Sequence, residues 1–142
     1  MAEHQSMIEI DADPEAVFDF LVTEEGMMAW MGQYAALDPR PGGGFAVNIA
    51  GYAIRGHYIE IDRPRRVTFT WGMEGSAALP PGASTVTFTL SPTPAGTRVE
   101  LRHTGLPDAE VAGHVHGWAH FLPRLGMAST GVELAPDDWR PI

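Results

Sequence analysis

The sequence contains no cysteine. This absence excludes disulfide bonds, thiolate catalysis and zinc sites built on cysteine ligands. Lysine is absent too, so the nine basic residues are all arginine, and 18 acidic residues outnumber them to give a net charge of −9. Because nucleic acids and anionic membranes attract basic surfaces, this charge argues against either as a partner.

Long hydrophobic runs are also missing. No apolar stretch has the length of a transmembrane helix, and the N-terminal MAEHQSMIEI lacks the basic region and apolar core of a secretory signal. We therefore expect a cytoplasmic protein that does not bind membranes. Frequent alanine, glycine and proline without lysine are typical of a GC-rich bacterial genome, and 142 residues predict one domain spanning 1–142.

Apolar and polar residues alternate along much of the chain. A short strand is expected at 8–10, and five more in the segments GGGFAVNIAG, AIRGHYIEID, RVTFTWGM, STVTFTLSP and GTRVELRHT. Because turn residues join these segments in series, they predict an antiparallel sheet of about six strands with one face toward solvent.

Helices are expected on both sides of this series of strands. Asp13 is a good N-cap and Pro14 suits the first helical position, while Thr23 can cap a second short helix that ends at Gly32. A long helix is expected from 107 or 108 toward 128. This order predicts an α+β fold in which the long helix covers the apolar face of the sheet.

The long helix and the strand before it hold four of the six histidines. Helical spacing places His116 and His120 on the outer face of the helix. The inner stripe would consist of Val111, His114, Val115, Trp118, Phe121, Leu122 and Leu125. Alternation along the last strand points His103 inward, so we expect His103 and His114 to line one interior.

Three residues of the predicted long helix disfavour helical structure. Gly113 and Gly117 each cost roughly 1 kcal/mol relative to alanine, and Pro123 removes one hydrogen bond and should bend the helix. These residues are typical of a helix that another segment approaches closely. They are equally typical of a helix that acts as a mobile lid.

Five segments together carry a family resemblance. They are DPRPGGGF (38–45), GHYIEIDRPRRVTFTWG (56–72), PPGASTVTFTL (80–90), GTRVELRHTGLP (96–107) and HVHGWAHFLPRL (114–125). In this order they resemble the family related to the activator of the heat-shock-protein ATPase (AHSA-type), part of the START-like, or SRPBCC, superfamily. The resemblance implies a helix-grip fold, in which a curved antiparallel sheet wraps around a long C-terminal helix and leaves a cavity between them.

The resemblance also implies a function. Superfamily members bind apolar or amphipathic small molecules in that cavity; some are cyclases, aromatases or hydrolases, and the family name suggests a co-chaperone. We therefore predict binding of a small apolar or amphipathic molecule, aromatic ones included, without a cofactor. The residues that we expect to line the site are Trp30, Phe45, Tyr58, Trp71, His103, His114, Trp118 and Phe121.

Core packing is an equal alternative for each of these aromatic residues. Methionines 27, 28, 31 and 73 are candidates for adaptable contacts with a ligand, or for ordinary packing. A histidine base at His103 or His114, oriented by Glu60, Asp62 or Glu74, would make the protein an enzyme of cyclase or hydrolase type. No nucleophile or paired-carboxylate motif accompanies these residues.

Three further hypotheses concern metals and partners. His116 and His120 have the spacing of two metal ligands, but no third ligand or zincin motif accompanies them, so we predict no metal site. A chaperone partner would bind through the outer face of the sheet. Homodimerisation stays open, because the C-terminal segment ELAPDDWRPI can pack through Trp139 on its own domain or on a neighbour.

Overall fold

The computed structural model describes residues 2–135, 137 and 139. Over these residues the chain forms, in order, β1 (Ala2–Ile10), α1 (Pro14–Val22), α2 (Glu24–Trp30), β2 (Tyr34–Leu37), β3 (Gly44–Ile49), β4 (Tyr52–Asp62), β5 (Arg66–Trp71), β6 (Ser84–Thr93), β7 (Gly96–Leu106) and α3 (Asp108–Ser129). The strands make one antiparallel sheet in the order β1-β7-β6-β5-β4-β3-β2. The predicted α+β helix-grip fold is confirmed.

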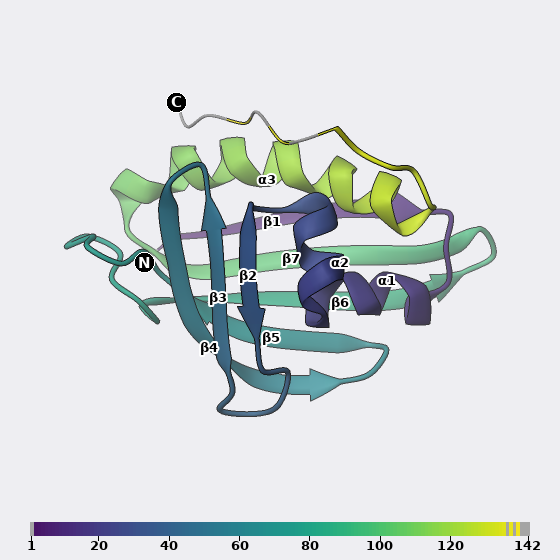
Figure 1. Ribbon diagram of the computed structural model, residues 1–142, viewed down its shortest axis with the longest axis horizontal. Helices are drawn as coiled ribbons and strands as arrows, with labels where there is room; N and C mark the ends of the chain where they lie inside the picture. The colour runs from purple at the N-terminus through teal and green to yellow at the C-terminus, as the bar shows by residue number, and fades with distance from the viewer. Residues whose placement is uncertain (1, 136, 138, 140–142) are drawn as a thin grey trace.

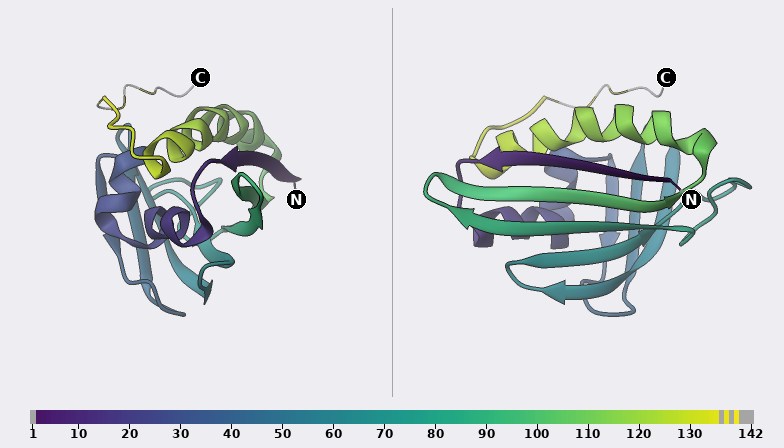
Figure 2. Two further views of the ribbon diagram at one scale, coloured as in Figure 1. Left: turned by 90° about the vertical axis from the view of Figure 1, so that its right-hand side faces the viewer. Right: turned by 180° about the vertical axis from the view of Figure 1, so that it is seen from behind.

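The sheet curves strongly around a central space (Figure 1). Strands β2, β3 and β4 stand upright in this view, and β5, β6, β7 and β1 cross behind them. Helix α3 lies along the open side of this curve, next to β1 at the edge of the sheet. Seen from the other sides, α3 runs along β1 and β7, while α1 and α2 lie inside the curve (Figure 2).

Both short helices begin at the residues that the sequence predicts. The Asp13 side chain accepts a hydrogen bond from the Ala16 amide at 3.0 Å, and Thr23 Oγ1 accepts one from the Gly26 amide at 3.1 Å. Each bond satisfies one of the amides that a helix leaves unpaired in its first turn. Local sequence therefore accounts for where α1 and α2 start.

The structure has seven strands where the sequence predicts about six. The additional strand, β2, is four residues long and pairs with β3 at the edge of the sheet. Its sequence, YAAL, shows no clear alternation, and its alanine and leucine residues favour helices. Pairing with β3, rather than local propensity, makes this segment a strand.

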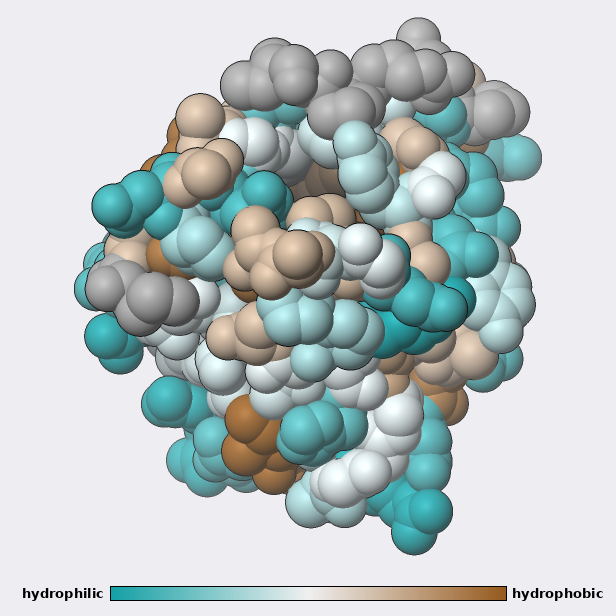
Figure 3. Space-filling model, turned by 90° about the vertical axis from the view of Figure 1, so that its left-hand side faces the viewer, coloured by the Kyte–Doolittle hydropathy of each residue, from teal (hydrophilic) through white to brown (hydrophobic). Residues whose placement is uncertain are grey.

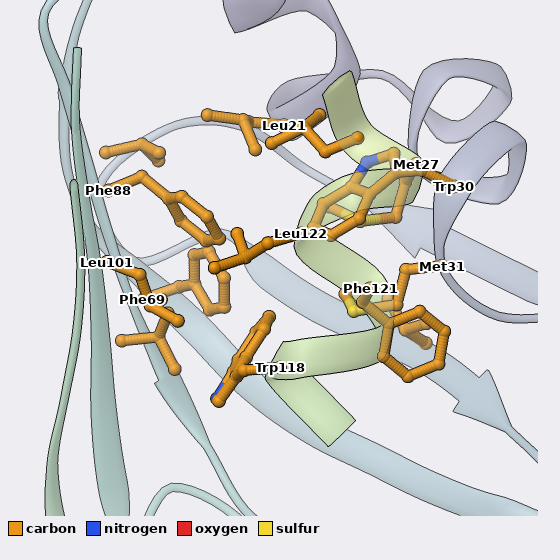
Figure 4. Packing of buried hydrophobic residues seen from close by; sticks show 14 of the residues in the cluster. Leu21, Met27, Trp30, Met31, Phe69, Phe88, Leu101, Trp118, Phe121 and Leu122 are labelled. Atoms are coloured by element: carbon orange, nitrogen blue, oxygen red, sulfur yellow. The ribbon is translucent and has the colours of Figure 1, made fainter. Parts of the chain in front are cut away.

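The core lies between the concave face of the sheet and the helices (Figure 4). Trp118 and Leu122 extend from α3 toward Phe69 and Phe88 of the sheet, and all four are nearly or fully buried. Next to them, α1 and α2 contribute Leu21, Met27 and Trp30, which are completely buried. None of the helices in the described part of the chain combines the length and hydrophobicity needed to cross a membrane.

The predicted inner stripe of α3 is buried or partly buried at every position except Val115. Trp118, Phe121, Leu122 and Leu125 are buried, whereas Val115 is 40% exposed. Helical spacing places Val115 near the stripe, but in the folded protein this position faces solvent. The predicted solvent-facing residues also differ, because His116 and His120 are only partly exposed.

Candidate functional site

A cavity of about 390 Å³ lies beneath the first half of α3 (residues 108–117). Opposite the helix, the ends of β3 and β4 and the end of β5 form its wall, with Met31 and Trp139 at its sides. Figure 3 faces this end of the molecule and shows a hollow near its top, bordered by pale and hydrophobic side chains. The cavity is thus open to solvent at one end.

Small residues on α3 create this space. Ala109, Gly113 and Gly117 follow one another at intervals of four, so they lie on one face of the helix, and all three line the cavity. A Cβ atom on Gly113 would meet nothing within 4 Å. In the sequence, the two glycines indicate a place of close approach or a mobile lid; their four-residue spacing with Ala109 also indicates a helix face of small residues.

Half of the predicted site residues line this cavity. Trp71 comes from β5, and His114, Trp118 and Phe121 come from α3. The predicted methionines Met31 and Met73 also line it. Sequence reasoning missed the other lining residues, which are Ile49, Tyr52, Ile54, Ala109, Glu110, Ala112, Gly113, Gly117 and Trp139.

The other predicted site residues lie in the packed core. Trp30 Nε1–H donates to the Phe20 carbonyl at 2.8 Å. The Tyr58 hydroxyl donates to the Leu21 carbonyl at 3.2 Å, and burial raises the pKa of Tyr58 well above its usual range. Phe45 stacks on the ring of Phe69 with 4.1 Å between the centroids. His103 is completely buried. For Phe45, Tyr58 and His103, alternation predicts which face of the sheet the side chain occupies, but not which part of that face borders the cavity.

His114 is held in one neutral tautomer. Its Nε2 atom lies 3.1 Å from Trp71 Nε1, and its Nδ1 atom lies 2.8 Å from the Glu110 backbone carbonyl. Because an indole N–H can only donate, Nε2 must accept this bond. The ring proton is therefore on Nδ1 and is donated to Glu110.

His103 is held in the opposite tautomer by a second indole. Trp118 Nε1–H donates to His103 Nδ1 at 3.1 Å, so the ring proton is on Nε2, which donates to Ser84 Oγ at 2.8 Å. Ser84 in turn donates to the Trp71 carbonyl at 2.8 Å. The two imidazole rings are 5.0 Å apart, centroid to centroid.

Burial reinforces the neutral form of these histidines. It lowers the pKa of His103 to about 3, with smaller contributions from His114 and His4. Burial also lowers the pKa of His114, although the backbone carbonyl and the carboxylate of Glu110 act in the other direction. His4, which pairs with His103 across β1 and β7, has its pKa lowered by burial and by His114.

These hydrogen bonds determine what the two histidines can do chemically. A general base needs a free lone pair within reach of the substrate proton. On His103 and His114 that lone pair already accepts from an indole N–H, and His103 does not line the cavity. The predicted pair does come together, but as part of a hydrogen-bonded network in which His114 lines the cavity and His103 lies behind it.

Asp137 and Trp139, near the C-terminus, both contact α3. Trp139 lies over α3, with its ring 5.5 Å from those of Phe121 and His116, centroid to centroid. Its Cζ2 atom is 3.6 Å from the position that a Cβ on Gly117 would occupy, so this glycine permits a close approach. Asp137 is 2.7 Å from His120 Nε2 and only 5% of its side chain is exposed.

These contacts explain why the two histidines on the outer face of α3 are partly covered. His120 bonds to Asp137, and the ring of His116 lies against that of Trp139 at an angle of 33°. Among the residues that the structure describes, no group of three or more histidines and carboxylates is placed to hold a metal ion.

The chain matches the family model "Activator of Hsp90 ATPase homolog 1-like protein" over residues 11–128. This match spans most of the chain and includes all three helices except the last residue of α3. The chain belongs to this family. No curated protein matches it in sequence.

Solved structures agree with this assignment. An AHSA1-like protein from Rhizobium etli is 37% identical, with a TM-score of 0.77 over 98% of this chain and 88% of that one. The Aha1 protein from Colwellia psychrerythraea, solved as a dimer, is 19% identical, with a TM-score of 0.79 over 94% of this chain and 98% of that one. DynU16, from the dynemicin biosynthetic locus, is 22% identical, with a TM-score of 0.81 over 97% of this chain and 51% of that one.

Proposed function

We propose that this family member binds a small apolar or amphipathic molecule in the cavity beneath the first half of α3. The observation that supports this most is that the indole and imidazole nitrogens in and behind the wall bond to one another. The indole N–H of Trp71 is taken by His114, and that of Trp118 by His103. Trp71 and Trp118 therefore offer the cavity mainly their apolar rings.

The size and lining of the cavity also favour a small ligand. Its volume of about 390 Å³ is within the usual range of small-molecule sites. Five lining residues are aromatic: Tyr52, Trp71, Trp118, Phe121 and Trp139. Flat aromatic walls and two flexible methionines suit an apolar or aromatic body. The place of DynU16 in a biosynthetic locus is what one expects of a fold that handles small molecules.

The enzyme alternative gains no comparable support. A histidine base would have to break an indole hydrogen bond before it could accept a proton from a substrate. A co-chaperone role would use the outer face of the sheet and would not depend on the cavity. We therefore propose ligand binding rather than catalysis or chaperone partnership.

The four indole N–H signals in an NMR spectrum provide a direct test. Trp71, Trp118 and Trp139 line the cavity, whereas Trp30 bonds to Phe20 in the core and does not line it. Titration with 2-naphthalenemethanol, a neutral aromatic probe, should shift the first three signals and leave that of Trp30 in place. Equal shifts of all four, or of none, would contradict binding in this cavity.

A cavity-filling substitution separates the site from the surface. Gly113→Leu places a side chain in the open space below α3 and should weaken probe binding at least about tenfold, because it occupies the ligand volume. Gly113→Ala controls for the gain in helix propensity. Ala119→Leu adds an equally large side chain at an exposed position of the same helix that does not line the cavity. Neither control should weaken binding comparably.

A further inference from the structure

One charged side chain stands out in this apolar cavity. Glu110 lines it and belongs to the first turn of α3, with 26% of its side chain exposed. Among the described lining residues, no other is acidic, and none is arginine. A carboxylate that a ligand would cover must find a compensating partner, because burying an unpaired charge is costly.

The protein itself does not provide that partner within the described residues. The only ionisable nitrogen within 4.0 Å of the Glu110 carboxylate there is His114 Nδ1, at 4.0 Å. This imidazole is neutral, and its Nδ1 proton goes to the Glu110 backbone carbonyl instead. Arg55 on β4 is engaged with Asn48 and Glu74 and does not line the cavity.

Aromatic rings surround the same space. Trp71 and Trp118 lie 5.4 Å apart, and Phe121 and Trp139 5.5 Å apart, centroid to centroid. The face of an aromatic ring carries partial negative charge and attracts organic cations, most strongly when the ring is tryptophan. The rings and the carboxylate therefore favour the same kind of ligand.

The start of α3 could in principle reverse this preference. The N-terminus of a helix carries roughly half a positive charge, which attracts anions. Two carboxylates, Asp108 and Glu110, occupy the first turn and together outweigh that charge. The entrance beside the helix therefore remains negative.

We infer that the ligand is an amphipathic organic cation: an apolar, aromatic-sized body with a protonated amine or quaternary ammonium group that pairs with Glu110. The inference rests on the proposed function, because it assigns a ligand class to the same cavity. The apolar body would occupy the space among Trp71, Trp118 and Phe121. The cationic group would lie at the Glu110 end, beside the neutral His114.

Three probes with one aromatic body test this directly. They are 2-naphthylmethylammonium (cation), 2-naphthalenemethanol (neutral) and 2-naphthoate (anion), each titrated into the intact protein at several salt concentrations. The cation should bind about tenfold more tightly than the neutral probe, and the anion more weakly than either. Calorimetry gives the affinities, and the indole N–H signals of Trp71 and Trp118 show that binding occurs in the cavity.

Two matched variants distinguish a specific contact from general attraction to a protein of net charge −9. In Glu110→Gln, the cation should lose its advantage over the neutral probe. In Asp108→Asn, which removes an exposed charge from the same helix turn outside the cavity lining, the advantage should remain. Thermal unfolding of both variants shows whether each remains folded.

The outcomes distinguish failure of the cationic-ligand inference from failure of the proposed cavity function. If all three probes bind equally, or if Asp108→Asn abolishes the cation preference as fully as Glu110→Gln, the inference of a cationic ligand is overturned, while the proposed cavity function stands. If no probe shifts the signals of Trp71 and Trp118, the proposed function fails, and the cationic ligand fails with it.

Discussion

The two halves of α3 perform different tasks. In the second half (118–129), six residues are buried, and Trp118 and Leu122 among them extend toward Phe69 and Phe88 of the sheet. In the first half (108–117), only Gly117 is buried, and four of the six residues that line the cavity are alanine or glycine. One helix can thus stabilise the core at one end and leave a ligand-sized space at the other. This is possible because the burial of each side chain depends on which residues lie beneath that turn of the helix.

The largest effect should come from truncating the second half. Leu125 is completely buried and does not line the cavity, so Leu125→Ala should lower the free energy of unfolding by roughly 2–5 kcal/mol. Val115→Ala in the first half removes an exposed side chain and should cost less than about 0.5 kcal/mol. Urea denaturation measures both, and similar costs would show that the two halves are packed alike.

Acid should reveal the polar network behind the cavity. His103 has a usual pKa of 6.5 and a folded-state pKa of about 3, so between these values the unfolded chain binds a proton that the folded chain does not. Stability should therefore be unaffected by His103 above about pH 6.5 and fall as the pH drops toward 3, by up to about 1.4 kcal/mol per pH unit. His4 and His114 add to this slope, because their pKa values are lowered too.

The contribution of His103 is measured as a difference in slope. Denaturation at several pH values between 4.5 and 7 gives the stability of the wild type and of His103→Gln. The variant should be less stable at pH 7, since Trp118 Nε1–H and Ser84 lose their partner, but its stability should fall less steeply with acid. Equal slopes would contradict a neutral, buried His103.

The C-terminal contact should have a smaller, local effect. Asp137→Ala removes the hydrogen bond to His120 and should cost about 1 kcal/mol of local stability. The Trp139 indole N–H should then exchange faster with solvent, as followed by NMR. Glu133→Ala, an exposed acidic residue of the same segment, is the matched control and should leave this exchange rate unchanged.

The smallest expected change in stability comes from replacing a glycine in either half of α3 with alanine. Gly113→Ala meets open space and should stabilise the protein by about 0.5–1 kcal/mol through helix propensity. A Cβ on Gly126 would approach Ile8 Cδ1 to 3.3 Å, so Gly126→Ala should gain less or nothing. Thermal unfolding measures the stability of both variants. An equal increase in stability at the two positions would show that the two halves of α3 do not differ in packing there.

The sequence by itself determines the order of all the elements except β2. Asp13 and Thr23 start their helices through their own side chains, and alternation in β6 and β7 selects the buried face, because these effects operate between near neighbours in the chain. The sequence also brings His103 and His114 to one interior, since each lies on a face that its period predicts.

Only the tertiary structure decided where the cavity lies. Alternation along the strands predicts that Phe45 and Trp71 face inward, but not that only Trp71 of the two borders an open space. The position of the open space depends on how far the sheet curves beneath α3. It also depends on the contact between Trp139, near the C-terminus, and Phe121 on the helix. The tautomers of both histidines likewise depend on two indoles from distant segments, which no local pattern relates.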